Sequence, residues 1–181
     1  VFFPSYSYME AVGRIFHAKY PKVKLVVQKH NMTYADKERF LGEFREDGKL
    51  RIGFCVLGGS FSEGIDLPGR RLIGVVVVGV GLPGLSSENN IIRDYYEEKS
   101  GSGYDYAYTY PGMNSVLQAV GRVIRRQDDR GIAVLIDDRY AEPKYRTLFP
   151  SFWQRVSYTS NPSSLAEVAR RFWKKKEQIN F

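Results

Sequence analysis

Cysteine and long apolar runs are scarce in this 181-residue chain. Its single cysteine, Cys55, excludes an intramolecular disulfide framework and a cysteine-rich metal site, and it fits a reducing compartment. Because Cys55 lies in an apolar run, we expect a small core residue. The longest apolar stretch, residues 72–80, is far shorter than the roughly 20 residues that cross a bilayer and is predicted to be a buried strand. No targeting signal is visible, and no membrane partner is expected.

Two sequence elements of nucleotide hydrolysis are also missing. The chain has neither a G-x-x-x-x-G-K-[ST] phosphate loop nor an Asp-Glu dipeptide that could hold magnesium. The loop lysine and magnesium neutralise the phosphates during transfer, so this chain cannot hydrolyse a nucleoside triphosphate alone. The net charge of +7 nevertheless favours a polyanionic partner.

Strand-like and helix-like segments alternate along the chain, which implies parallel βαβ units and an α/β layered fold. The expected strands are residues 1–4, 23–27, 52–57, 72–80 and 132–137, and the expected helices are residues 6–20, 34–46 and 86–99. Near the C-terminus, Leu165, Val168, Ala169, Phe172 and Trp173 mark the apolar face of a further helix. For its basic face we favour solvation over contact with DNA.

The segment from Gln118 to Arg125 carries the strongest chemical signal. Arg122 and Arg125 are three residues apart, so on a helix they would leave one face about a turn apart. Two guanidinium groups held in this way suit a polyphosphate, and Gly121 leaves room for close approach to the backbone. An arginine pair alone would equally fit a solvated helix face.

A glycine-rich segment, residues 58–66, follows the expected strand at residues 52–57. Backbone N–H groups in such a turn can face an anion, although a plain tight turn has the same composition.

Together these two segments resemble motifs V and VI of superfamily 2 helicases, specifically the XPD/DinG-type DNA helicases. The signatures there read S-E-G-I-D and Q-x-x-G-R-x-I-R, as residues 62–66 and 118–125 do here. Residues 1–6 resemble motif IV, and the order and spacing of all three agree. The resemblance implies that residues 1–181 form the second, C-terminal RecA-like domain, with a mainly parallel central sheet flanked by helices and an insertion around 82–111. Because the chain begins within an expected strand and without methionine, we expect a fragment of a longer chain.

The resemblance also implies roles at a nucleotide. Arg122 and Arg125 match the motif VI arginines that reach the γ-phosphate of ATP across an interdomain cleft, with Arg125 as the finger and Arg122 as its partner. Gln118 matches the glutamine that links nucleotide state to domain closure. Gly64 and Asp66 of motif V are expected nearest the nucleotide.

On the nucleic-acid side, the resemblance implies contacts from Ser5, Ser60 and Ser62. The expected partners are single-stranded or forked DNA and the N-terminal RecA-like domain of the same polypeptide. That first domain would hold most of the ATP and Mg²⁺, and in this family it often carries an iron–sulfur cluster. We expect the intact protein to be a monomeric, cytoplasmic helicase with 5′-to-3′ polarity. The isolated chain of residues 1–181 would be inactive. The residues alone do not distinguish DNA from RNA.

Two other functions fit parts of the sequence. Residues 79–84 match G-x-G-x-x-G, and Glu97 and Glu98 follow near the spacing of a ribose-binding acid, as in an NAD-binding domain. Against this, Pro83 removes a donor from the loop, and the preceding strand is the fourth in the chain. The other alternative is a nucleic-acid-binding module, or a degenerate helicase-like subunit, without ATP chemistry.

The tyrosines at 104, 106, 108 and 110 alternate within the expected insertion. In an extended segment they would share one side and could stack on unpaired bases. An edge strand packed on a neighbouring helix has the same pattern, and we favour that interpretation.

Overall fold

A computed structural model describes residues 1–59, 61, 67–124, 129–153 and 156–174. The chain divides into two compact units, Val1–Tyr140 and Ala141–Phe181, and each unit is described by itself.

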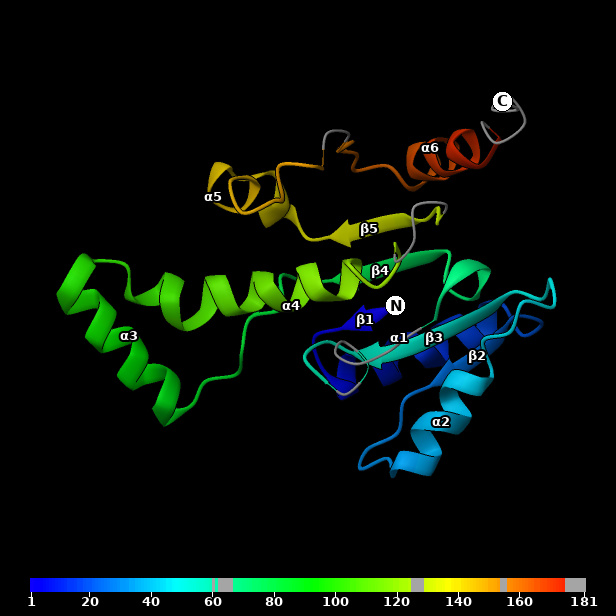
Figure 1. The fold of residues 1–181 in the computed structure, drawn as a ribbon, viewed down its shortest axis with the longest axis horizontal. Helices are drawn as coiled ribbons and strands as arrows, with labels where there is room; N and C mark the ends of the chain where they lie inside the picture. The colour runs from blue at the N-terminus through cyan, green and yellow to red at the C-terminus, as the bar shows by residue number, and fades with distance from the viewer. Residues whose placement is uncertain (60, 62–66, 125–128, 154–155, 175–181) are drawn as a thin grey trace. The chain divides into compact units, whose positions relative to one another are not determined.

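A parallel sheet with the strand order β2-β3-β1-β4-β5 forms the centre of the first unit (Figure 1). Its strands are β1 (Phe2–Phe3), β2 (Lys24–Val27), β3 (Arg51–Val56), β4 (Gly74–Val78) and β5 (Ile132–Ile136). The expected α/β fold with a parallel sheet is therefore confirmed. Strand β4 stops before the expected end at residue 80, because Gly79 takes a positive φ of 84° and turns the chain.

The helices follow the expected order, with differences in length. Longer helices are α1 (Tyr6–Lys19), α2 (Tyr34–Gly42), α3 (Ser87–Ser100), α4 (Tyr110–Val120) and α6 (Pro162–Lys174), and short ones are η1 (Gly69–Arg71), η2 (Asp105–Thr109), η3 (Asp138–Ala141) and α5 (Pro143–Arg146). Helix α2 ends four residues before the expected end at residue 46. The guanidinium of Arg71 donates to the Phe44 carbonyl at 2.9 Å and to the Leu41 carbonyl at 3.3 Å, which satisfies carbonyls at that helix end.

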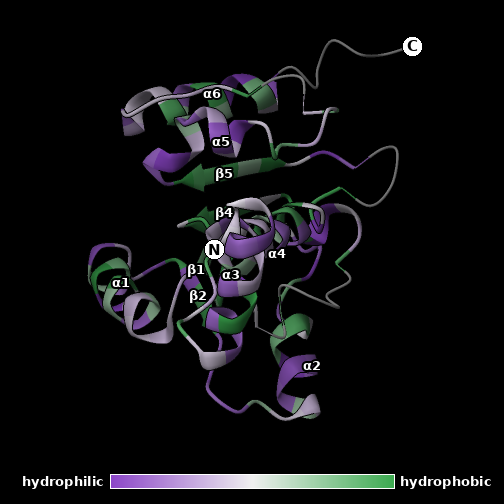
Figure 2. Ribbon diagram, turned by 90° about the vertical axis from the view of Figure 1, so that its left-hand side faces the viewer, coloured by the Kyte–Doolittle hydropathy of each residue, from purple (hydrophilic) through white to green (hydrophobic). Residues whose placement is uncertain are grey.

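Side chains on both faces of the sheet are covered. On one face, Phe3 and Phe54 form a buried cluster with Met9 of α1. On the other, the register aligns Phe2 with Cys55 and with Val77, and all three are buried. Strand β5, for example, is drawn green along most of its length in Figure 2. Covering on both faces explains the continuous apolar sequence of β4.

Cys55 lies in this core, where burial raises the pKa of its thiol to about 12. The thiolate is the reactive form, so the folded protein should resist a thiol reagent at pH 8 and react at one thiol per chain in denaturant. Stopped-flow labelling with a chromogenic disulfide measures both states. Rapid labelling of the folded chain would contradict the placement of Cys55 in the core.

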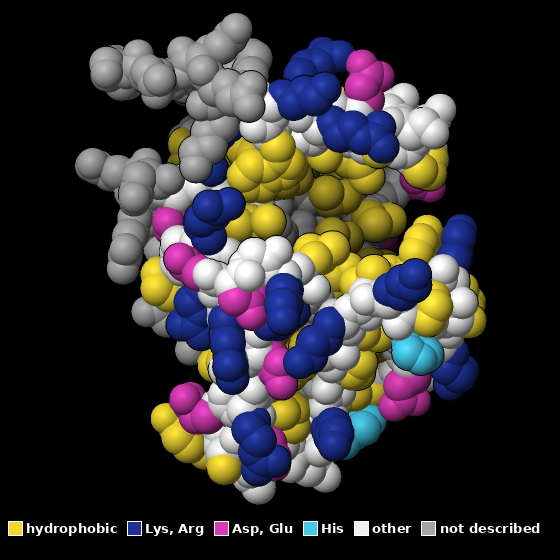
Figure 3. Space-filling view, turned by 90° about the vertical axis from the view of Figure 1, so that its right-hand side faces the viewer, with side chains coloured by type: hydrophobic (Ala, Val, Ile, Leu, Met, Phe, Trp, Pro, Cys, Tyr) yellow, Lys and Arg dark blue, Asp and Glu magenta, His cyan; other side chains and the backbone are white. Residues whose placement is uncertain are grey.

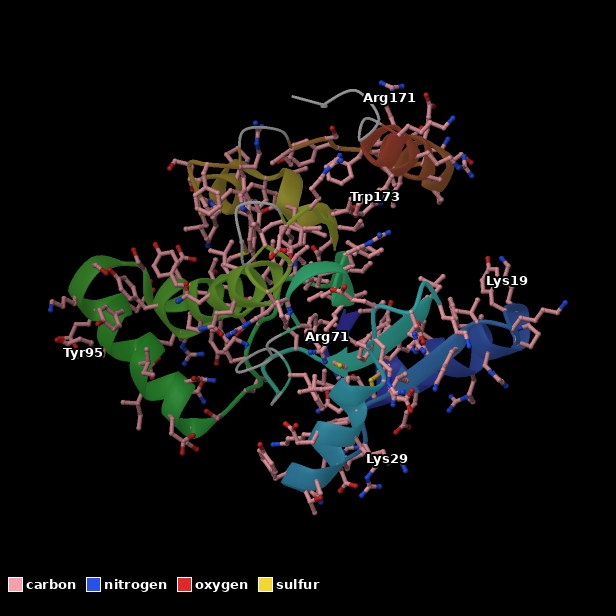
Figure 4. The ribbon with its side chains drawn as sticks, turned by 45° about the vertical axis from the view of Figure 1, so that its right-hand side comes forward. Lys19, Lys29, Arg71, Tyr95, Arg171 and Trp173 are labelled. Carbon is pink, nitrogen blue, oxygen red and sulfur yellow. The ribbon has the colours of Figure 1, made fainter. Side chains whose placement is uncertain are left out.

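In the second unit, Tyr145 is buried, and the ring of Phe149 lies 5.2 Å from that of Trp153. Helix α6 keeps a solvated basic face, on which Arg171 pairs with Glu167 at 2.8 Å. Arg171 and Trp173 leave the helix in different directions (Figure 4). None of the helices in the described ranges combines the length and apolarity needed to cross a bilayer.

Candidate functional site

The carboxyl ends of β1, β2 and β3 meet at one edge of the sheet, because these strands are parallel neighbours. Ser5 follows β1 at this edge, and the glycine-rich segment begins there after β3. The Ser5 hydroxyl caps helix α1 by accepting from the Tyr8 N–H at 3.2 Å, and it lies 3.0 Å from the Ser7 hydroxyl. The predicted nucleic-acid contact therefore also fixes the start of a helix.

Gln28 joins the three strand ends at this edge. Its side chain is 6% exposed; its Oε1 accepts from the Val56 N–H at 2.9 Å, and its Nε2 donates to the Tyr6 hydroxyl at 2.8 Å. A Cβ added to Gly59 would lie 3.4 Å from the same Nε2. Gln28 thus connects the end of β2 to the first turn of α1 and to the start of the glycine-rich segment. The sequence analysis missed this residue, whose one signal is an amide directly after an apolar strand.

A pocket of about 220 Å³ opens beside Gln28. It is lined by Tyr6, Gln28, Lys29, Asn31, Met32, Lys37, Gly59 and Phe61. Phe61 is 2% exposed, and its ring lies 4.4 Å from that of Phe40 in α2. This contact packs Phe61 against helix α2.

Helix α4 carries the described part of the predicted arginine site. Gln118 is exposed on the helix, and Arg122 is half-exposed just beyond its end. The N–H groups of Arg122 and Val123 bond to carbonyls three residues back, at 3.3 Å to Ala119 and 3.1 Å to Val120. Helix α4 therefore ends at Val120 and does not extend to Arg122, because the chain tightens into a turn. Arg125 lies outside the described residues, so its spacing from Arg122 stays a prediction.

Val123 holds this turn in place. Its side chain is 4% exposed, and a Cβ added to Gly131, which leads into β5, would overlap it. Of the residues predicted to contact the polyphosphate, Arg122 is the one with a described position.

Five predicted site residues lie outside the described residues. These are Ser60, Ser62, Gly64, Asp66 and Arg125. Their roles at nucleic acid or nucleotide stay predictions.

The tyrosine-rich segment is not extended, so both interpretations based on an extended chain were wrong. Residues 105–109 form the π-helix η2, which runs directly into α4. Gly101 ends α3 in the left-handed conformation, with φ at 65°, and lets the chain turn back. Tyr106 stacks on Tyr96 of α3, with ring centroids 3.9 Å apart and planes 6° apart, and Tyr108 is buried. These rings pack an α3–η2 hairpin.

The G-x-G-x-x-G stretch has a packing role in place of the NAD-binding one. Helix α3 begins only at Ser87, so the glycines do not form its N-terminus, as a dinucleotide loop requires. Gly81 has a φ of 69°, and a Cβ there would lie 2.7 Å from the carbonyl oxygen of Gly112. The two glycines let the chain after β4 touch helix α4 backbone to backbone.

No group of three or more His, Cys, Asp or Glu side chains that could hold a metal ion occurs in the part of the chain that the structure describes. On the side drawn in Figure 3, Lys and Arg side chains outnumber Asp and Glu. That balance agrees with the net charge of the sequence.

Comparisons with known proteins identify the family and support the fold. The sequence profile of the family described as helicase C-terminal domain matches residues 1–156. The chain is 27% identical to a regulator of telomere elongation helicase 1 homolog of Caenorhabditis elegans, covering 99% of this chain and 20% of that protein. It is 29% identical to the helicase subunit XPD of general transcription and DNA repair factor IIH of Schizosaccharomyces pombe, covering 94% of this chain and 24% of that protein.

Among solved structures, XPD_APO superposes with a TM-score of 0.64 at 21% identity, covering 81% of this chain and 29% of that one. This likeness supports the fold. The chain spans about a fifth to a quarter of the length of these two curated relatives.

Proposed function

This chain belongs to the helicase C-terminal domain family, and from that premise we propose that it is the second motor domain of an ATP-dependent DNA helicase of XPD/DinG type. The observation that carries the proposal is the end of α4, where a helix packed into the domain exposes Gln118 and is followed by the half-exposed Arg122. A relative named as an ATP-dependent DNA helicase and another named as the helicase subunit of a DNA repair factor support the same function. Residues 1–181 would act as one domain, with 82–111 as its insertion.

At the nucleotide, Arg122 and Arg125 neutralise charge on the γ-phosphate of an ATP that the N-terminal RecA-like domain of the same polypeptide holds with Mg²⁺. Arginine suits this role because it stays charged and binds oxyanions through two N–H groups. Gln118 senses the nucleotide, and Gly64 and Asp66 line its site. An iron–sulfur cluster, where one exists, belongs to that first domain.

On the nucleic acid, Ser5, Ser60 and Ser62 contact the sugar–phosphate backbone. Such contacts position a strand without reading its sequence, as a motor that moves along DNA requires. ATP draws the two domains together, and hydrolysis releases them, so that the domain steps along a single strand in the 5′-to-3′ direction. The enzyme acts on single-stranded or forked DNA as a monomer in the cytoplasm.

ATP turnover tests the proposal in a protein that contains this chain and a first motor domain. We expect hydrolysis that single-stranded DNA stimulates, together with unwinding of a forked duplex, and neither activity from residues 1–181 alone. Tight DNA binding without hydrolysis would indicate a non-catalytic nucleic-acid-binding module instead.

A further inference from the structure

We propose that the pocket beside Gln28 binds one backbone phosphate of a single DNA strand, with Lys29 and Lys37 as its cationic ligands. The inference rests on the proposed function, since it assigns a further contact to the strand on which the motor acts. Neither lysine is among the site residues predicted from the helicase motifs.

Two lysines line the pocket from different elements. Lys29 directly follows Gln28 after β2, and Lys37 lies in α2. Neither forms an ion pair with any residue that the structure describes, whereas Lys24 and Arg51 elsewhere on the same sheet pair with carboxylates. Two lysines at one pocket that form no ion pair among the described residues leave positive charge for an anion.

Asp36, which directly precedes Lys37 in the sequence, already accepts hydrogen bonds. Asp36 accepts from the Thr33 N–H at 3.0 Å and from the Thr33 hydroxyl at 2.6 Å, which forms the capping box of α2. These hydrogen bonds are the main reason why the pKa of Asp36 is lowered, and Arg39 and Lys29 contribute less. Asp36 therefore stays ionised for the helix cap, and the lysine ammonium groups remain available to a ligand.

Neutral donors complete the pocket. The Tyr6 hydroxyl accepts from Gln28, and its own proton has only a long contact of 3.5 Å to the Lys29 carbonyl. A stacked His30 ring, 3.6 Å from the Tyr6 ring, holds the phenol in place. Asn31, at a left-handed φ of 51°, contributes an amide to the lining. A phosphate can thus receive hydrogen bonds from a fixed hydroxyl as well as charge from two lysines.

The position of the pocket favours a strand over a free anion. Ser5 precedes Tyr6, and Gly59, which lines the pocket, precedes Ser60. Both serines are predicted contacts of the DNA backbone. A strand that contacts Ser5 would therefore pass the pocket at Tyr6, where one of its phosphates can bind.

Lysine-to-glutamine variants test the site in a protein with both motor domains. Each lost phosphate contact lowers the dependence of log K on log salt by about 0.7 for single strands, which corresponds to about fivefold in affinity at 0.1 M salt. We expect the K29Q/K37Q double variant to lose about this much affinity for an oligothymidylate, measured by fluorescence anisotropy over a salt series. ATP hydrolysis without DNA should be unchanged.

The Lys19→Gln/Lys22→Gln double variant is the matched control, because it also removes two lysine charges, at and just beyond the far end of α1 (Figure 4). Its salt slope should equal that of the wild type. Unaltered strand binding by the K29Q/K37Q double variant, alongside normal binding by the wild type, would overturn this inference and leave the proposed function intact. Wild-type protein that fails to bind single strands would overturn both. The K29Q/K37Q double variant could also lose binding of thymidine monophosphate while its strand binding stays unchanged. That result would assign the pocket to a free nucleotide and overturn the proposal.

Discussion

Replacing Arg125 with alanine in a protein that holds both motor domains should lower the DNA-stimulated kcat for ATP hydrolysis at least a hundredfold. An arginine that stabilises transition-state charge on a transferring phosphoryl group contributes about 10³–10⁵ in rate. Because this interaction strengthens in the transition state, kcat should fall while KM for ATP changes little. Steady-state kinetics with saturating single-stranded DNA measures both constants.

Arg122→Ala should cause a loss of the same kind, because Arg122 is fixed at the end of α4 by the buried Val123. Arg122→Lys separates charge from geometry, since lysine keeps the charge and loses the bidentate fork. Arg170→Ala, an exposed change on α6, is the control and should leave kcat unchanged. If kcat falls only in Arg122→Ala, Arg122 is the arginine finger. If kcat is unchanged in both Arg122→Ala and Arg125→Ala, the assignment of these arginines to the nucleotide is refuted.

The sequence predicted the alternation of elements because local patterns determine it. The apolar run of β4 and the helix expected at residues 6–20 are visible within a few residues. Features set by distant partners were not predictable. Helix α2 ends early because of Arg71, which is 27 residues from Phe44, and the end of β3 is tied to Gln28, which is 28 residues from Val56.

The tyrosine segment at residues 104–110 is a case in which a local sequence pattern predicted the wrong conformation. Alternating tyrosines indicate an extended chain when considered alone, yet the stack of Tyr106 on Tyr96 of α3 stabilises a helical turn. Tertiary contacts therefore overrode a local period of two.

Gly112→Ala should destabilise the first unit by about 1–3 kcal/mol, although alanine favours helices over glycine. Gly112 lies inside α4, and an added Cβ would approach the carbonyl oxygen of Val80 at 2.7 Å and the backbone of Gly81 at 3.0 Å. Backbone atoms cannot rotate away, so helix α4 would have to move from the sheet. Labelling of Cys55 in a urea series measures the change, because this thiol is buried in the same unit.

Gly42→Ala is the matched control, since Gly42 also lies in a helix and an added Cβ there meets no atom within 4 Å. It should be neutral or stabilising by up to about 1 kcal/mol. Because α4 also carries Gln118 and leads to Arg122, a displacement at Gly112 should lower ATP turnover in the two-domain protein even below its unfolding transition. Equal stability of the two alanine variants would contradict the close backbone contact between α4 and the chain after β4.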